Sequence, residues 1–171
     1  AEFVREDIGR SGIHLNAIVD ETRPTINKNA IVAGGYRMLK IDTLDNRGIS
    51  EQIAKRIVRA IKETPSDAVV FSDFRHGMFN GESIPILTAA IPDGTFKVAD
   101  SQVASRWGNI LDFGGFDLIT PNEKEARFSL GDQDTVIRPL GTRLYEEAKC
   151  KVLILKLGAR GSMTFREGGG E

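Results

Sequence analysis

The sequence contains one cysteine, Cys150, so no disulfide can form within the chain. A sequence this poor in thiols fits a reducing compartment, and no apolar run resembles a signal peptide or a membrane-spanning helix. The formal net charge is only −1 and basic residues do not cluster, which argues against nucleic acid or an anionic membrane as a partner. We therefore expect a cytoplasmic protein that binds neither nucleic acid nor membrane.

The chain is long enough to form one globular domain with a hydrophobic core. It has 171 residues, of which 40% are hydrophobic and 27% charged, the usual balance for such a domain. It begins at Ala1 without a methionine, and residues 166–171 resemble a hairpin loop that lacks its return strand. We expect residues 1–171 to be a single domain that is incomplete at both ends.

The first part of the chain, approximately residues 13–42, is predicted to be rich in β-structure. Residues 13–19 and 26–33 have the apolar content of strands. Gly34 and Gly35 then form a strong two-residue hairpin signal before another strand at 36–41. These residues predict a β-hairpin set apart from the remaining sequence.

The remaining sequence, residues 50–171, alternates between helices and short apolar strands. Ser50 is suited to cap a helix that ends before Pro65. The expected strands cover 68–71, 96–99, 116–120, 152–157 and 162–165, and the expected helices 82–90, 122–130 and 139–149, with a looser segment around Trp107 at 103–112. This alternation predicts an α/β core with a mostly parallel sheet and helices on both faces.

Polar residues follow several of the predicted strands at their carboxyl ends. Asp73, Asp100, Asn122 and Lys156 all stand at or just after such an end. In open parallel sheets, ligands bind at this edge. The sequence therefore predicts one site where these side chains converge.

The run Leu118–Glu125, with the sequence LITPNEKE, places Asn122 and Glu125 three residues apart in the first turn of a helix. Residues at this spacing share a helix face. An amide that binds phosphate or water, beside a carboxylate that holds Mg²⁺ through water, suits phosphoryl transfer. The same two residues also form a capping box, so the pattern by itself leaves both interpretations open.

Several stretches together resemble the ribokinase (PfkB) family of carbohydrate kinases. The matching stretches are VAD at 98–100, LITPNEKE at 118–125 and LKLGARG at 155–161. Within that family the chain is most similar to heptose-phosphate kinases, the kinase half of ADP-heptose synthases, through RPTINK at 23–28, LKID at 39–42 and VVFSDFRHG at 69–77. The resemblance implies a ribokinase-like three-layer, Rossmann-like sandwich with part of a β-lid over residues 13–42.

The resemblance also implies transfer of the γ-phosphate of ATP to a sugar hydroxyl with Mg²⁺. Asn122 and Glu125 match the family motif that organises magnesium, water and phosphate, with Glu125 acting on the metal through water. Lys156 matches the strand end beside the phosphates, or is a solvated strand end. Gly158 and Gly161 allow close backbone approach or form a plain turn. Asp100 orders water or the Lys156 ammonium, or caps the next segment.

The expected substrate is a sugar or sugar phosphate. Lys28 and Lys40 lie on the segment that resembles the substrate lid, where they either bind a phosphorylated substrate or form a solvated charged face. Asp73 and His76 follow the preceding core strand. The heptose-phosphate kinases usually carry lysine at the position of His76, which is either a phosphate ligand or an exposed loop residue. Lid strands in this family often form dimer contacts, so the resemblance also implies a homodimer.

Two family segments have no counterpart in the sequence, which has neither the sugar-binding Gly-Gly-x-x-x-Asn nor the Gly-Ala-x-Gly-Asp that carries the catalytic base. We therefore expect no catalytic residue in this chain and a base beyond Glu171. An alternative is a non-catalytic nucleotide- or sugar-binding module derived from a kinase. A dinucleotide-binding domain is disfavoured because no Gly-x-Gly-x-x-Gly follows a predicted strand.

Overall fold

The computed structural model describes residues 2–102 and 109–168, so Trp107 and most of the predicted segment 103–112 lie outside the described residues. The helices are α1 (Glu2–Arg10), α2 (Glu51–Glu63), α3 (Ser83–Thr88), α4 (Glu123–Leu130) and α5 (Ile137–Ala148), with short 3₁₀ turns η1 (Ile110–Phe113) and η2 (Gly158–Arg160). The strands are β1 (Asn27–Ala33), β2 (Tyr36–Thr43), β3 (Ala68–Asp73), β4 (Phe96–Ser101), β5 (Leu118–Ile119), β6 (Val152–Lys156) and β7 (Ser162–Arg166).

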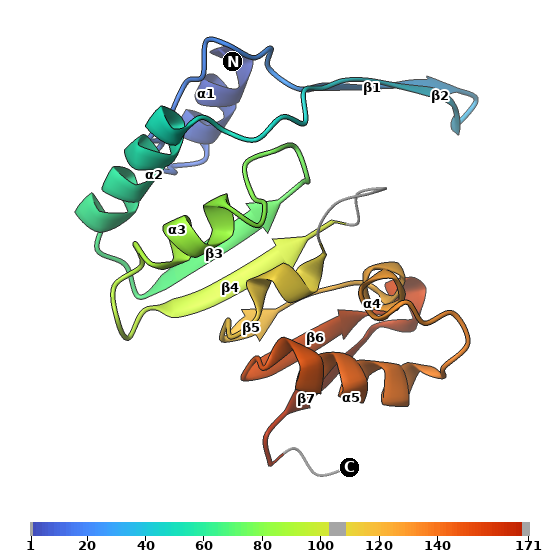
Figure 1. Ribbon diagram of the computed structural model, residues 1–171. Helices are drawn as coiled ribbons and strands as arrows, with labels where there is room; N and C mark the ends of the chain where they lie inside the picture. Colours follow the sequence, from blue (N-terminus) through green and yellow to red (C-terminus); the bar gives the residue numbers. More distant parts are fainter. Residues whose placement is uncertain (1, 103–108, 169–171) are drawn as a thin grey trace.

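The core is a five-stranded sheet in the order β3-β4-β5-β6-β7 (Figure 1). The pairs from β3 to β6 are parallel, and β7 returns antiparallel to β6. The predicted mostly parallel sheet is confirmed, with strand β5 shorter than expected. Because the parallel strands run the same way, their carboxyl ends meet along one edge.

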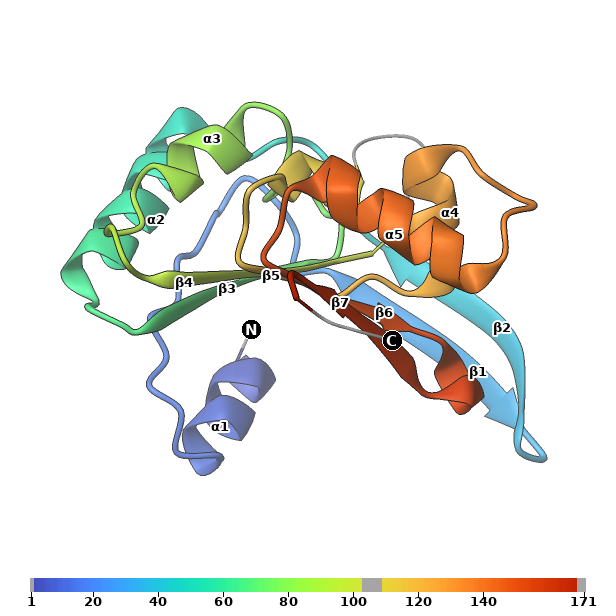
Figure 2. The same cartoon turned by 90° about the horizontal axis from the view of Figure 1, so that it is seen from below.

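Helices α2 to α5 lie together on one face of this sheet, and α1 lies on the other side (Figure 2). Strand β3 alternates accordingly, with Phe71 buried and Val70 60% exposed on the opposite face. In the parts of the chain that the structure describes, no helix has both the length and the apolar character needed to cross a bilayer.

Helix α2 illustrates how local sequence sets the element boundaries. The Ser50 hydroxyl accepts a hydrogen bond from Ile53 N at 3.3 Å, so it caps the helix as predicted. Ile57, Val58 and Ile61 recur at helical spacing and pack against the buried core. The helix ends at Glu63, and the Thr64 cap precedes Pro65.

The hydrophobic core beneath the helices contains a cluster of phenylalanines. Phe71, Phe79, Phe113 and Phe116 have neighbouring ring centroids 4.9–6.3 Å apart, mostly in tilted or edge-to-face arrangements. Such pairs add to the stabilisation that burial of the rings provides. The cluster joins β3 to η1 and to the residues just before β5. It therefore holds in place the elements that lead to the carboxyl ends of the strands.

Strands β1 and β2 form an antiparallel ribbon joined by Gly34 and Gly35, as predicted. Both glycines have positive φ, 57° and 81°, which a tight hairpin of this type requires. We call residues 27–43 the ribbon. Every residue in its two strands is exposed, so the ribbon projects from the domain instead of packing into the core (Figure 1).

The prediction of a strand at residues 13–19 is wrong, and α1 was not anticipated. Alternating apolar residues in this segment resemble a strand, but a strand needs a neighbouring backbone. Instead, Arg56 donates from Nη1 to the Val19 carbonyl at 2.9 Å. Helix α1 is highly charged, with an exposed Arg10–Glu6 ion pair at 3.5 Å, and has no buried residue to signal it.

We predict that Gly141→Ala destabilises the protein. A Cβ at this position in α5 would lie 2.2 Å from the Phe165 ring on β7, so the ring must move. We expect the free energy of unfolding to fall by about 1–3 kcal/mol in urea denaturation, the usual cost of overpacking. At an exposed helical position the same change stabilises by about 0.5–1 kcal/mol. A more stable Gly141→Ala variant would therefore contradict the observed packing.

Candidate functional site

A pocket lies at the carboxyl ends of the parallel strands. Its volume is about 390 Å³, within the range of small-molecule sites. The lining residues are Asp100, Gln102, Asn122, Lys124, Glu125 and Lys156. Four residues predicted from the sequence, from the ends of β4 and β6 and the start of α4, therefore line one pocket.

Asp100 connects two strand ends across the pocket. Its Oδ1 accepts a hydrogen bond from Thr120 Oγ1 at 2.8 Å and pairs with Lys156 Nζ at 2.7 Å. The Lys156 and Asp100 side chains are 45% and 44% exposed, so water screens their attraction and the pair contributes about 1 kcal/mol or less. Because the pair is weak, an anionic ligand can draw the Lys156 ammonium away from Asp100 at small cost.

Asn122 and Glu125 form the predicted capping box at the start of α4. Asn122 Oδ1 accepts from Glu125 N at 3.0 Å, and Glu125 Oε2 accepts from Asn122 N at 2.6 Å. Asn122 also lies beside Lys156, because Lys156 N donates to the Pro121 carbonyl at 2.8 Å. Glu125 is only 7% exposed and lines the pocket. Capping and pocket lining are therefore compatible roles of the same side chains.

The loop that contains Gly158 and Gly161 follows Lys156 directly, although neither glycine lines the pocket. Their φ angles are 63° and 86°, which favour glycine. Leu157 N donates to the Gly161 carbonyl at 2.8 Å and closes the loop. Arg160 forms an ion pair with Glu123, which fastens this loop to the first turn of α4.

Glu123 is charged over the whole neutral range. Hydrogen bonds from the Arg127 side chain, and then from Arg160, lower the pKa of Glu123 below its ordinary value. Glu123 and Arg160 are not among the site residues predicted from the sequence. The two residues carry opposite charges beside the two motifs. They lie 37 residues apart in the sequence, so no local pattern indicates that they are in contact.

His76 and the two ribbon lysines form a second group at the loop after β3. His76 Nδ1 lies 3.1 Å from Asn46 Oδ1, and its buried Nε2 has no hydrogen-bond partner among the described residues. Lys28 Nζ is 5.5 Å from the Phe74 ring centroid, within cation–π range. Lys40 pairs with Asp42 at 2.8 Å.

The pKa of His76 is lowered from its ordinary value, first by burial and then by the positive charge of Lys28. The charges of Asp42 and Lys40 also act on the ring. The imidazole is therefore neutral at pH 7. Lys28, Lys40 and His76 thus share one electrostatic environment, although they come from distant parts of the sequence.

Asp73 lies inside the protein and is 3% exposed. It accepts hydrogen bonds from Arg75 N at 2.7 Å and Ser101 Oγ at 2.9 Å, and pairs with Arg75 Nε at 2.9 Å. Arg75 also reaches Asp112 at 3.2 Å and has a positive φ of 58°. These contacts occupy the Asp73 carboxylate with protein donors. Sequence reasoning missed Arg75, because nothing local indicates its buried position.

Comparisons with known proteins agree with this architecture. No protein-family model matches the chain. It is 26% identical over 167 residues to the bifunctional protein HldE of Pelobacter propionicus, covering 94% of this chain and 33% of that protein. It is 28% identical over 162 residues to HldE of Desulfatibacillum aliphaticivorans, covering 88% and 31%. The chain thus spans about a third of the length of the curated relatives it matches.

The solved structures that resemble this chain establish its fold. Phosphofructokinase-2 from Escherichia coli, in complex with fructose-6-phosphate, has a TM-score of 0.73 at 16% identity, covering 98% of this chain and 56% of that chain. Ribokinase from Giardia lamblia has a TM-score of 0.74 at 15% identity, covering 99% and 56%. The expected ribokinase-like α/β fold is confirmed.

We predict that Lys28→Gln raises the pKa of His76, because it removes a positive charge that opposes protonation of the ring. The imidazole resonances in NMR spectra, recorded across pH 5–8, report this pKa. Lys62→Gln on α2 is the charge-matched control and should leave the titration unchanged. An identical His76 titration in the Lys28→Gln variant would contradict the electrostatic contact.

Proposed function

We propose that this relative of the HldE proteins, with its ribokinase-like fold, takes part in ATP- and Mg²⁺-dependent phosphorylation of a sugar or sugar phosphate, of a heptose-phosphate-like kind. The observation that carries this proposal is the pocket at the carboxyl ends of β4 and β6. It combines two carboxylates, two amides and two lysines, Asp100, Glu125, Gln102, Asn122, Lys124 and Lys156. Positioning and charge stabilisation supply most of the catalysis in phosphoryl transfer.

The positive groups of the pocket are suited to the phosphates of a nucleotide. Lys156 and Lys124 line the pocket, and the N-terminus of α4 favours negative charge. In this proposal Lys156 leaves Asp100 and binds phosphate oxygens. Gly158 and Gly161 let the following loop approach the nucleotide closely, while the Glu123–Arg160 pair holds that loop against α4.

The donor set also fits magnesium. Mg²⁺ prefers oxygen ligands and usually keeps several waters, with one or two carboxylates from the protein. Glu125 is held by the Asn122 backbone and lines the pocket, so its carboxylate is suited to bind metal-coordinated water, with Asp100 as a second acidic group. A bound Mg²⁺ would neutralise phosphate charge, and Glu125 and Asp100 would hold it through its coordinated water.

The ribbon and the loop after β3 are proposed to bind the acceptor. Lys28, Lys40 and the neutral His76 offer a phosphorylated sugar two ammonium groups and an imidazole. The His76 Nε2 is buried and has no hydrogen-bond partner among the described residues, so it would reach a ligand only if the loop shifts. Asp73, by contrast, supports this region from within by fixing Arg75.

A non-catalytic binding module would use the same pocket without transfer. The two functions separate when the natural polypeptide carrying this sequence is incubated with Mg²⁺ and ATP and a panel of sugars and sugar phosphates. Transfer of γ-phosphate supports the kinase, whereas nucleotide binding without transfer to any acceptor supports the module. We propose that the acceptor base is supplied by residues beyond Glu171.

We further propose that the ribbon pairs with a second copy of the chain. Tyr36 is 76% exposed, Met38 68% and Val32 60%, an unusual apolar density for a projecting element. A lone two-stranded ribbon is at best marginally stable in water. Pairing of two ribbons would bury these side chains and stiffen the surfaces that carry Lys28 and Lys40.

We predict that Glu125→Gln weakens binding of Mg²⁺–ATP about tenfold, since it removes a charge that acts on metal-bound water. Glutamine keeps an acceptor oxygen for Asn122 N, so stability should change little. Isothermal titration calorimetry gives the affinity and urea denaturation the stability, with Glu63→Gln on the exposed end of α2 as control.

Glu125→Ala removes both the charge and the cap, and should lower the free energy of unfolding by about 0.5–2 kcal/mol. If both variants bind Mg²⁺–ATP as the parent does, Glu125 serves as a cap and the proposed metal role fails.

We predict that Met38→Asp converts a dimer into monomers by placing a charge in the proposed interface. Sedimentation velocity measures the two species, and we expect the dimer dissociation constant to rise about tenfold or more. Ile86→Asp is the control, because Ile86 is 53% exposed on α3, away from the ribbon. A monomeric parent protein would contradict the pairing.

A further inference from the structure

The direction in which the ribbon projects must be set at its base. All residues of β1 and β2 are exposed, so burial of apolar side chains in the core does not orient them. The chain enters the ribbon through residues 19–26 and leaves it through residues 44–50, and we call these two segments the stems. Whatever fixes the stems fixes where Lys28 and Lys40 lie.

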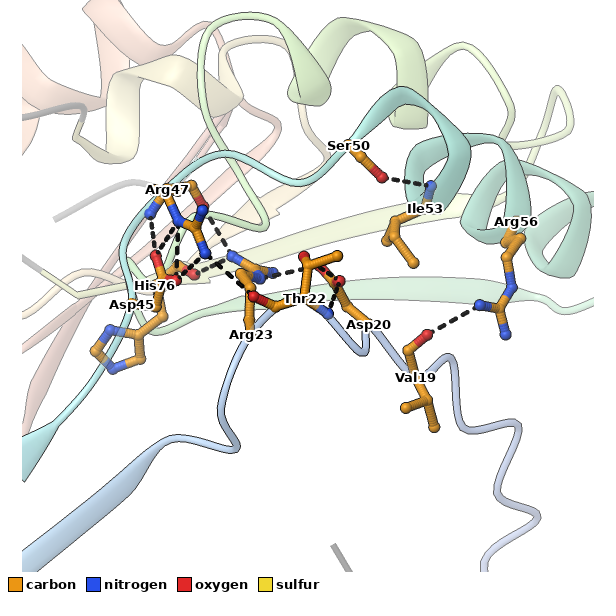
Figure 3. A network of polar contacts seen from close by, with 10 residues as sticks. All are labelled: Val19, Asp20, Thr22, Arg23, Asp45, Arg47, Ser50, Ile53, Arg56 and His76. Carbon is orange, nitrogen blue, oxygen red and sulfur yellow. Dashed lines mark hydrogen bonds and ion pairs between the residues drawn. The ribbon is translucent and has the colours of Figure 1, made fainter.

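Arg23 joins the two stems to each other and to the core loop (Figure 3). Its Nη1 donates to the Arg47 carbonyl at 2.7 Å and, more weakly, to the His76 carbonyl at 3.5 Å. Its Nε pairs with Asp20 at 3.1 Å within the entering stem. One guanidinium thus bridges three separate chain segments.

Arg47 completes the contact in the reverse direction, donating from Nη2 to the Thr22 carbonyl at 3.2 Å. It forms hydrogen bonds of 2.6–3.0 Å with Asp45, which hold the pKa of Asp45 at about 2. The lowered pKa means that this carboxylate stays charged until the pH falls toward 2. Both partners are therefore charged throughout the neutral range.

Exposure distinguishes the contributions of the two arginines. The Arg23 side chain is 17% exposed and Asp20 16%, whereas the Arg47 side chain is 69% exposed. Contacts of a largely exposed arginine are screened and contribute little, while those of a mostly buried guanidinium are stronger. Arg23 is therefore the principal connection.

Gly77 permits the leaving stem to lie close against the loop after β3. We call this contact between the stems and the loop the junction. Its φ is 85°, and a Cβ there would lie 1.9 Å from the Arg47 carbonyl oxygen. Ile49 N donates to the Gly77 carbonyl at 3.1 Å, so the leaving stem lies directly against the loop after β3. That loop is held to the core through Arg75, Asp73 and Asp112.

From these contacts we propose that Arg23 is a positioning residue, which locks the stems to the loop after β3 and thereby fixes Lys28 and Lys40 of the ribbon relative to His76. The structural part of this proposal rests on the contacts between the two stems and the loop after β3. Its consequence for phosphate transfer rests on the proposed function. Loss of Arg23 lets the ribbon pivot, so the acceptor groups no longer converge while the nucleotide pocket is unchanged.

The test measures the orientation of the ribbon directly. Spin labels at Tyr36→Cys, on the ribbon tip, and Glu146→Cys, on α5, give a distance distribution by pulsed electron resonance. Cys150 is 6% exposed and burial raises the pKa of its thiol, so it resists labelling. Labelled protein is diluted into unlabelled protein to remove distances between copies.

We expect a narrow distance distribution in the parent protein and a broader or shifted one in Arg23→Gln. Arg56→Gln is the matched control, because Arg56 binds the Val19 carbonyl from α2 but does not join the two stems (Figure 3). Unchanged distances in Arg23→Gln, or equal broadening in Arg56→Gln, would overturn the proposal.

Arg47→Gln keeps the test decisive if Arg23→Gln does not fold, since its exposed side chain tolerates replacement. It should broaden the distribution by a smaller amount, and no change would count against the junction. Where transfer is measurable, Arg23→Gln should raise KM for the acceptor about tenfold and leave KM for ATP unchanged. If the natural polypeptide carrying this sequence transfers no phosphate to any acceptor, the proposed function fails, but the distances still decide the role of Arg23.

Discussion

The parallel register of β3 to β6 is the constraint on which the rest of the structure depends. Ala99 and Ile119 pair in register, as do Ile119 and Leu153, and all three are fully buried. Such a tightly packed row leaves little freedom for one strand to slide past another. Because the register is fixed, the strand ends are aligned, and polar residues distant in sequence form one pocket.

Two ion pairs at this edge differ in burial and therefore in what they do. Asp73 and Arg75 have side chains 1% and 4% exposed, so breaking their pair leaves an uncompensated buried charge. The Asp100–Lys156 pair is nearly half exposed and is easily exchanged for a ligand. One pair fixes the loop after β3, the proposed acceptor region, and the other leaves the Lys156 charge accessible at the pocket.

Local signals predicted much of this architecture. Ser50 and Pro65 bounded α2, paired glycines marked the ribbon, and Asn122 with Glu125 marked the start of α4. The convergence of Asp100 and Lys156 followed from strand direction alone. Residues 13–19 misled because alternation indicates a strand only where a partner strand exists. The Arg75 side chain also pairs with Asp112, which is 37 residues away, and no local pattern reports such a contact.

The loop after β3 connects the core to the stem of the ribbon through consecutive residues. Arg75 fastens it to the core and Gly77 admits the stem of the ribbon, with His76 between them. Lowering of the His76 pKa by burial and by Lys28 keeps the ring neutral until a negative charge offsets both effects. A bound phosphate would supply that charge and favour protonation. The proposed binding of an acceptor phosphate at this loop would then strengthen the attraction between His76 and that phosphate.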